Sequence, residues 1–215
     1  MSSTMGGSSP AIVFEDVNLD AVCLSVFHER FRNNWQICCA IKRLIVYESL
    51  FEKTVEKLTA IIGKQVIGDP LDKKTTIGPL AAKRQLETLE EQVEDARRKG
   101  AQIVVGGKRP EGLSGAYYMP TLITNVTPDM KVVSEEVFGP VLPVSTFRTE
   151  EEAIRAANDT PYGLSAFVYS KDQKRAERVA RALEAGQVSI NGCSYFSTNA
   201  PFGGYKKSGL GRIKG

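Results

Sequence analysis

Histidine and cysteine, which supply many of the metal ligands in proteins, are scarce in this sequence. The 215 residues include one histidine, His28, and four cysteines, Cys23, Cys38, Cys39 and Cys193. No two cysteines have the C-x-x-C spacing of a zinc or redox motif, and a lone histidine has no partner ligand. Four cysteines in a chain of this length are also too few for a disulfide framework. The sequence therefore predicts no metal site, and it predicts reduced thiols in a cytoplasmic protein.

Long apolar runs and a strong charge of either sign are also absent. No stretch approaches the roughly 18 apolar residues that span a membrane. Residues 1–5 lack the basic and apolar regions of a signal peptide, and we interpret them as a leader or cloning remnant. The 28 basic and 25 acidic residues give a net charge of +3. This excess is too small to indicate binding to nucleic acid or to an anionic membrane.

Short runs of β-branched and apolar residues alternate with helical patterns along most of the chain. In the helical segments, apolar residues recur at the three- and four-residue spacing of an amphipathic helix. This alternation is typical of domains in which crossover helices join parallel strands. We predict a single α/β domain with a mostly parallel open sheet and helices on both faces. The predicted strands are 11–14, 43–47, 102–105, 141–147, 164–169 and 187–191, and the predicted helices are 18–32, 50–62, 80–99, 149–158 and 172–185.

Several helix ends carry sequence signals. Ser49 and Thr149 are each followed three residues later by glutamate, which is the pattern of a capping box. Gly100 and Gly186 follow the last apolar positions of two helices, where glycine commonly ends a helix. Residues 120–123 have the composition of extended chain, but the predicted sheet does not include them.

Cys38 is the candidate nucleophile that the residues themselves suggest. It lies in the segment 33–39, which is rich in asparagine and glutamine, between a predicted helix and a predicted strand. A thiol in a turn, close to amide and backbone N–H donors, is suited to nucleophilic catalysis. A cysteine is more often a small apolar packing residue, and the pattern alone favours that interpretation.

No glycine-rich loop matches a phosphate-binding motif. A dinucleotide fingerprint requires G-x-G-x-x-G directly after a strand, but residues 209–214 lack the third glycine. A Walker loop requires G-x-x-x-x-G-K-[ST], and the glycine pair at 106–107 has the wrong spacing. Local pattern therefore predicts no phosphate-binding loop.

Six blocks of sequence, in a fixed order, resemble the motifs of one enzyme family. They are residues 6–16, 34–38, 67–80, 135–141, 158–164 and 201–212. The most specific are the blocks that begin at Glu135 and at Asn158. Over residues 6–215 the chain resembles the catalytic domain of the NAD(P)-dependent aldehyde dehydrogenase superfamily. The resemblance implies that family's fold for the same residues.

The resemblance also implies chemistry at Cys38. This residue matches the family's nucleophile, which adds to an aldehyde to form a thiohemiacetal. Loss of hydride to the nicotinamide then leaves a thioester that water hydrolyses. Cys39 would be a packing residue beside the nucleophile. Glu136 matches the carboxylate that binds the nicotinamide-ribose hydroxyls, and Phe138 matches the ring beside the nicotinamide, so the implied cofactor is NAD or NADP.

Other matches concern the substrate and the assembly. Phe196 and Phe202 match aromatic residues of the family's substrate tunnel, with plain core packing as the alternative. Asn191 matches the loop that leads into the tunnel, with a turn at a strand end as the alternative. The implied substrate is a small-molecule aldehyde. We expect a homo-oligomer, because a surface that packs against another domain is partly apolar.

The chain departs from the family in length and at the active site. The family's full chain is more than twice as long, so we expect the nucleotide-binding domain and the C-terminal oligomerisation strand to be absent and NAD to bind weakly or not at all. Thr4 stands at the position of the family's general base, and its hydroxyl does not accept a proton at neutral pH. Trp35 replaces a glycine beside the nucleophile.

The resulting hypothesis is an aldehyde-oxidising catalytic domain that is inactive as an isolated chain. Two alternatives are kept. One is a thiol esterase that uses Cys38 without a cofactor. The other is a non-catalytic assembly module that keeps only the fold.

Overall fold

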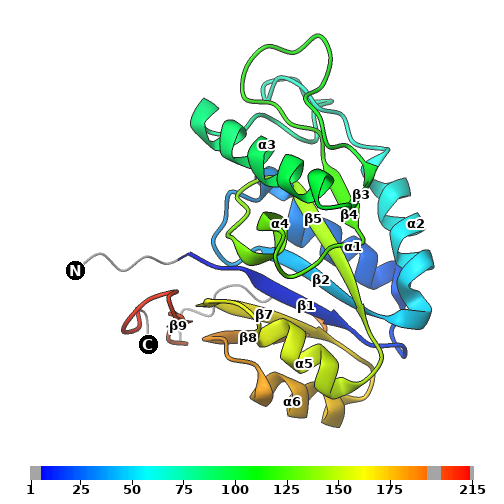
Figure 1. Ribbon diagram of the computed structural model, residues 1–215, viewed down its shortest axis with the longest axis vertical. Helices are drawn as coiled ribbons and strands as arrows, with labels where there is room; N and C mark the ends of the chain where they lie inside the picture. Colours follow the sequence, from blue (N-terminus) through cyan, green and yellow to red (C-terminus); the bar gives the residue numbers. More distant parts are fainter. Residues whose placement is uncertain (1–5, 193–199, 214–215) are drawn as a thin grey trace.

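A seven-stranded sheet forms the centre of the molecule (Figure 1). The computed structural model describes residues 6–192 and 200–213. Within these residues the strand order of the sheet is β3-β4-β5-β2-β1-β7-β8. The strands are β1 (Ser9–Val13), β2 (Ile41–Tyr47), β3 (Gln102–Val105), β4 (Thr121–Thr124), β5 (Val141–Phe147), β7 (Ser165–Tyr169) and β8 (Gln187–Ile190).

The sheet is parallel apart from one pair of strands at its edge. β3 runs antiparallel to β4, and every other neighbouring pair is parallel. The predicted α/β class and mostly parallel sheet are therefore confirmed. β4 is the strand that was not predicted as part of the sheet. All four of its residues are buried, so it lacks the alternation of apolar and polar residues that marks a strand in a sequence.

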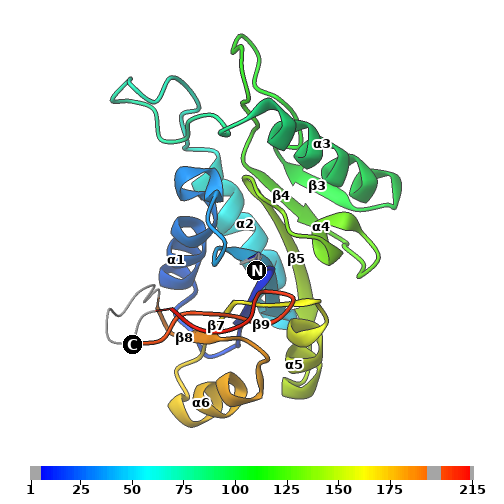
Figure 2. The same ribbon diagram turned by 90° about the vertical axis from the view of Figure 1, so that its left-hand side faces the viewer.

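Helices cover both faces of the sheet, as predicted (Figure 2). Because successive strand residues point to opposite sides, β1 contributes Ala11 and Val13 to one core and Ile12 to the other. β2 also contributes to both cores, so the turn that precedes β2 leads into a well-packed strand. α1 (Leu19–Phe31) and α2 (Phe51–Ile62) pack on one face, and α3 (Lys83–Arg98), α4 (Lys131–Ser134), α5 (Glu150–Asn158) and α6 (Gln173–Ala182) pack on the other.

The helix caps agree with the sequence signals at some ends and not at others. Thr149 forms the predicted capping box of α5 with Glu152. Gly100 has the predicted left-handed backbone after α3, with φ 92°. The capping box predicted at Ser49 is wrong: a 3₁₀ turn, Glu48–Leu50, precedes α2, and no side chain caps that helix. The chain is already helical at Ser49, so its hydroxyl cannot take the extended cap position.

Gly186 has a different role from the predicted one. α6 ends earlier, with Leu183 as its cap residue. A Cβ atom on Gly186 would lie 1.8 Å from the carbonyl oxygen of Gly203, so the close approach of two backbone segments requires glycine here. This contact holds the C-terminal segment against the sheet, beside the two-residue strand pair β6 (Tyr162–Gly163) and β9 (Tyr205–Lys206).

The C-terminal segment also contacts the start of the chain. Ser208 is fully buried; its hydroxyl donates to Gly6 O at 2.6 Å and accepts from Gly163 N–H at 2.9 Å. Three segments that are far apart in the sequence therefore meet just before β1.

In the described part of the chain, no helix combines the length and the apolar character that a bilayer crossing requires. The longest helix, α3, has 16 residues and is rich in charged side chains.

Candidate active site

The segment between α1 and β2 presents Cys38 in a turn, as predicted. After α1, a 3₁₀ turn (Arg32–Trp35) contains Asn33 and Asn34 with left-handed backbone angles, φ 56° and φ 49°. Asparagine tolerates this conformation better than most residues. The buried Asn34 side chain donates a hydrogen bond to Gly78 O at 2.6 Å. The turn is therefore attached to a loop outside its own element.

Gln36 attaches the same segment to the start of α3. Its Oε1 accepts a hydrogen bond from Ala81 N–H at 2.7 Å, and its Nε2 donates to Asn33 O at 3.3 Å. The asparagines and glutamine noted in the sequence thus fix the turn rather than serve only as donors near the thiol.

The Cys38 thiol is half-buried and acidic. The neighbouring Cys39 side chain donates a hydrogen bond to the Cys38 sulfur, and this bond lowers the pKa of Cys38 below the ordinary value of a thiol. Burial opposes this effect, while the charge of Lys42 and the backbone N–H groups of Cys38 and Cys39 lower the pKa further. A thiol with a lowered pKa supplies more of the nucleophilic thiolate at neutral pH.

Cys39 packs in an apolar cluster with Leu164 and Phe202, as expected of a packing residue beside the nucleophile. It is buried, and its pKa is raised, first because its proton is held by the Cys38 sulfur and then because burial disfavours a charge. Cys23 provides the contrast. It is buried in the α1 core, and burial raises its pKa to about 12.

Gly7 brings the chain before β1 against the Cys38 turn. A Cβ atom on Gly7 would lie 2.6 Å from the Cys38 carbonyl oxygen, so only glycine fits at this approach. Gly7 N–H donates to Glu136 Oε1 at 2.8 Å, and Lys42 Nζ donates to the same oxygen at 3.0 Å. One glycine therefore contacts both the candidate nucleophile and the candidate cofactor residue.

Glu136 and Phe138 line an open cleft of about 430 Å³. Two glutamines of α3 hold this segment by its main chain: Gln92 Nε2 donates to Glu136 O at 3.3 Å, and Gln85 Nε2 donates to Phe138 O at 3.3 Å. Gln36, from the turn segment, lines the same cleft. The cleft thus lies between α3 and the segment that carries the thiol.

The carboxylate of Glu136 fits a ligand with hydroxyl groups. Its side chain is 22% exposed, and no donor in the described part of the chain is bonded to Oε2. A Cβ atom on Gly6 would lie 2.6 Å from Oε2, so the glycine keeps this oxygen open. A carboxylate oxygen accepts hydrogen bonds from ribose hydroxyls, and the Phe138 ring offers an apolar surface beside it. The residues present therefore fit the nicotinamide-ribose end of NAD(P).

Phe202 lies in the same apolar cluster as the cysteine pair. Its buried side chain packs with Cys39 and Leu164, and Cys38 lies at the edge of this cluster. The position agrees with a substrate-tunnel role and with core packing alike, so the role of Phe202 in substrate binding stays a prediction.

Asn191 makes the contacts of a turn at a strand end, and its match to the tunnel loop stays a prediction. Its Nδ2 donates to Ser170 O at 2.7 Å, its Oδ1 accepts from Ser170 N–H at 2.9 Å, and its backbone is left-handed, with φ 53°. Phe196, Cys193 and Thr4 lie outside the described residues.

Lys42 is a residue of this site that was not anticipated from the sequence. It is buried, its Nζ binds Glu136, and the same atom lies 4.3 Å from the centroid of the Phe138 ring. Burial lowers the pKa of Lys42 to about 8, although the Glu136 carboxylate acts in the opposite direction. The predicted strand began at Arg43, which left Lys42 in a loop. The available signal was a lysine among the apolar residues that begin a strand.

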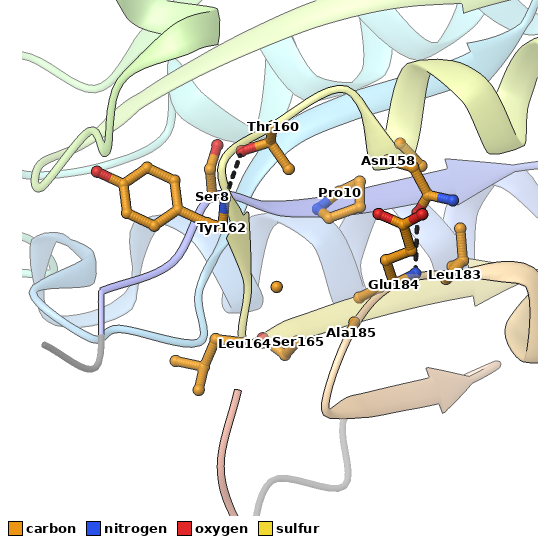
Figure 3. Close-up of a pocket in the computed structure, with 13 residues that line it drawn as sticks. Ser8, Pro10, Asn158, Thr160, Tyr162, Leu164, Ser165, Leu183, Glu184 and Ala185 are labelled. Carbon is orange, nitrogen blue, oxygen red and sulfur yellow. Dashed lines mark hydrogen bonds between the residues drawn. The ribbon is translucent and has the colours of Figure 1, made fainter. Parts of the chain in front are cut away.

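A second hollow, beside β1, is too small to be a substrate site (Figure 3). Ser8, Tyr162 and Ser165 are among the side chains around it, and its volume is about 10 Å³. That volume is roughly the space of one water molecule. The Ser8 hydroxyl is buried and has no hydrogen-bond partner among the described residues, which suits a water-sized hollow.

The chain is similar to aldehyde dehydrogenases along its whole length. A model of the aldehyde dehydrogenase family matches residues 1–215. The chain is 46% identical over 216 residues to "Aminoaldehyde dehydrogenase 1, peroxisomal" of Pisum sativum, covering 100% of this chain and 43% of that protein. It is 44% identical over 208 residues to succinate-semialdehyde dehydrogenase (NADP+) of Deinococcus radiodurans, covering 97% of this chain and 43% of that protein. The chain therefore spans less than half the length of these curated relatives.

Solved structures of aldehyde dehydrogenases are also similar to this chain. A betaine aldehyde dehydrogenase from Staphylococcus aureus, in complex with NAD+, aligns with a TM-score of 0.94 and 39% identity, over 98% of this chain and 42% of that chain. A succinate-semialdehyde dehydrogenase from Burkholderia pseudomallei aligns with a TM-score of 0.94 and 42% identity, over 99% of this chain and 44% of that chain.

Proposed function

Because this chain belongs to the aldehyde dehydrogenase family, we propose that it supplies the catalytic cysteine of an enzyme that oxidises a small aldehyde to a carboxylic acid with NAD(P). Residues 6–215 form the catalytic domain in this proposal, and Cys38 is the nucleophile. The observation that supports it most is the place of Cys38, a half-buried thiol in a turn that Asn34 and Gln36 fix by hydrogen bonds to other segments.

Cys38 performs the first step. Its thiolate sulfur adds to the carbonyl carbon of the aldehyde, so a C–S bond forms and the carbonyl oxygen receives the electron pair. The backbone N–H groups of Cys38 and Cys39 lie where they stabilise negative charge at the sulfur. Donors in such a turn are also suited to stabilise the oxygen of the thiohemiacetal.

NAD(P), when bound, supplies the acceptor for the hydride that oxidation of the aldehyde releases. Glu136 Oε2 and the Phe138 ring would hold its nicotinamide-ribose end. The acid is released when water hydrolyses the thioester on Cys38 and returns the free thiol. Thr4, at the position of the family's general base, lies outside the described residues, and a hydroxyl does not accept the proton of this water at neutral pH.

The second candidate function is a thiol esterase that uses Cys38 alone. One observation favours it: the groups that lower the pKa of Cys38 are Cys39, Lys42 and backbone N–H groups, all within this chain. Acyl transfer to Cys38 therefore needs no cofactor.

The substrate class and the compartment are also proposals. Relatives are named for aminoaldehydes, betaine aldehyde and succinate semialdehyde, so a small polar aldehyde is the class we propose. Three cysteines, Cys23, Cys38 and Cys39, are free thiols, which suits a reducing compartment such as the cytosol. Relatives are named as peroxisomal, chloroplastic or mitochondrial, so cell fractionation is the appropriate test.

A homo-oligomer is proposed as the assembly. Leu71 and Leu210 are 90% and 92% exposed, and large apolar side chains in water favour association. Sedimentation velocity at micromolar concentration should show dimers or larger species. A strictly monomeric chain at every concentration would contradict the proposal.

A test of the function uses p-nitrophenyl acetate, an activated ester that acylates thiols. We expect a burst of about one p-nitrophenolate per chain, an acetyl group on Cys38 by peptide mass spectrometry and almost no steady turnover. Cys38→Ser should abolish the burst, and Cys23→Ser should keep it. A full burst from Cys38→Ser would exclude Cys38 as the nucleophile, whereas steady turnover would favour the esterase.

Aldehyde chemistry is tested without a cofactor. A small aldehyde that adds reversibly to Cys38 should protect this thiol from iodoacetamide in proportion to its concentration. The matched alcohol should not protect. Equal protection by the alcohol, or no protection by any aldehyde that reaches the site, would contradict the dehydrogenase proposal and leave the esterase.

A further inference from the structure

Lys42 is a buried cation that the proposed mechanism does not use. A bulge in β2 sets its position. One step of β1, from Ser9 to Pro10, is matched by two steps of β2, from Ile41 to Arg43, so Lys42 is the extra residue. β-Bulges redirect a side chain and are common next to active sites.

Two groups hold the Lys42 ammonium in place. Nζ donates to Glu136 Oε1 at 3.0 Å and lies 4.3 Å from the centroid of the Phe138 ring, which is within the range of a cation–π interaction. The lysine side chain is 1% exposed. An ammonium group so deeply buried is costly unless its charge is compensated, and Glu136 supplies the compensating charge.

The same carboxylate oxygen connects Lys42 to the nucleophile. Glu136 Oε1 also accepts from Gly7 N–H at 2.8 Å, and Gly7 packs directly on the Cys38 carbonyl oxygen. Lys42 follows Cys38 by only four residues across the turn. Lys42, Glu136, Gly7 and the Cys38 main chain therefore form one connected set of contacts. The charge of the buried Lys42 side chain acts along this set to lower the pKa of Cys38.

Other ionisable groups around Lys42 favour or disfavour its positive charge. Arg30, on α1, is fully buried, has no hydrogen-bond partner among the described residues and disfavours the charge on Lys42. Glu136 and the Cys38 thiolate favour that charge. The charge of Glu29, also on α1, raises the pKa of Cys39. With a pKa of about 8, Lys42 is mainly charged at neutral pH and loses its charge in mild base.

We propose that Lys42 is a positioning residue for the reaction at Cys38, whose buried ammonium, held by Glu136 and Phe138, stabilises the thiolate that attacks the substrate. The role of Lys42 in catalysis rests on the proposed function. The effect of its charge on the reactivity of Cys38 does not depend on which substrate the thiolate attacks.

The test measures alkylation of Cys38 by iodoacetamide, followed by peptide mass spectrometry, as a function of pH. Lys42→Gln keeps a hydrogen-bond donor to Glu136 but removes the charge, Lys42→Met removes both, and Lys42→Arg keeps both. Lys108→Met is the matched control, because it removes one lysine from an exposed ion pair with Glu111 in the loop after β3. Circular dichroism and thermal unfolding establish which variants are folded.

We expect Lys42→Gln and Lys42→Met to alkylate about tenfold more slowly than the wild type at about pH 5, because below the pKa of Cys38, about 6, a rise of one pKa unit lowers the thiolate fraction tenfold. The difference should vanish near about pH 9.5, where the thiol ionises without help. Lys42→Arg and Lys108→Met should match the wild type. If Lys42→Met does not fold, Lys42→Gln and Lys42→Arg still provide the comparison.

Two results would overturn the proposal. The first is a Lys42→Gln rate equal to the wild-type rate at the lower pH. The second is the same slowing at every pH, which would mean that the substitution changes access to Cys38 rather than its ionisation. Alkylation requires no aldehyde, ester or cofactor. If the ester test contradicts the proposed function, the alkylation rates therefore still test the effect of Lys42 on Cys38.

Discussion

At the scale of single residues, the reactivity of Cys38 follows from its immediate neighbours. The Cys39 thiol donates to its sulfur, and Lys42 and two backbone N–H groups add positive potential. Each of these effects favours the thiolate, and together they outweigh the burial that opposes it. Adjacent cysteines therefore have different functions here: one carries the charge and the other holds a proton toward it.

The hydrogen bond from Cys39 is tested by replacing its donor. Cys39→Ala removes the donor, so the pKa of Cys38 should rise and its alkylation profile should move to higher pH by about one unit. Cys39→Ser keeps a hydroxyl donor and should restore most of the wild-type profile. Rates of iodoacetamide alkylation at Cys38 across pH provide the measurement. An unchanged profile in Cys39→Ala would show that the bond does not control the thiol.

At the scale of elements, sequence patterns predicted the helix caps that depend on contacts between residues close in the sequence. Asn18 caps α1, and Thr149 caps α5 with its glutamate partner, as its sequence pattern predicted. Ser49 has the same sequence pattern, yet a 3₁₀ turn places it before α2 with no cap hydrogen bond. Here Glu48 binds Arg148, a residue one hundred positions away, and no local pattern contains that contact.

The two capping patterns give a matched pair of variants. Thr149→Ala should lower the free energy of unfolding by about 1 kcal/mol, because it removes a side chain that accepts from Glu152 N–H. Ser49→Ala should change that free energy by less than about 0.5 kcal/mol. Urea unfolding of both variants gives the comparison, and a larger loss from Ser49→Ala would contradict the assigned caps.

Part of the candidate site was predictable, because that part depends on short segments of sequence. The turn at Cys38 follows from its own segment, and the resemblance led to Glu136 and Phe138. Their meeting place depends on Gly7 and Lys42, which become neighbours only through the order of the strands and the bulge in β2. A residue whose role arises from such long-range contacts carries no signal of its own in a single sequence.

At the scale of the whole molecule, the site joins segments from most of the chain. The segment before β1, the turn before β2, helix α3 and the segment after α4 meet at one end of the sheet. The C-terminal segment closes over the same region through Ser208 and Phe202. Ionisation at the site is therefore linked to folding, since no single element assembles it.

This linkage predicts a pH dependence of stability. The pKa of Cys38 is lower in the folded chain than in the unfolded chain, so between the two values the unfolded chain binds more protons. The contribution of Cys38 to stability is full above its unfolded pKa, about 8.5, and is lost as the pH falls through the folded value.

Urea unfolding under reducing conditions measures this contribution as the difference between wild type and Cys38→Ser. We expect the difference to grow in favour of the wild type as the pH rises through the neutral range. Cys23→Ser should show no such trend below about pH 8.5, since burial raises the pKa of Cys23 and the thiol is protonated in both states there. A difference for Cys38→Ser that does not vary with pH would contradict the lowered pKa.

The most direct measurement is competitive labelling of all the thiols in the native chain with limiting iodoacetamide near about pH 6.5, read by peptide mass spectrometry. Cys38 should be labelled first, about tenfold or more faster than Cys23, because Cys39 and Lys42 lower the pKa of Cys38 whereas burial raises the pKa of Cys23. If Cys23 or Cys193 is labelled first, or if Cys38 reacts only above the pH of an ordinary thiol, Cys38 is not the activated nucleophile.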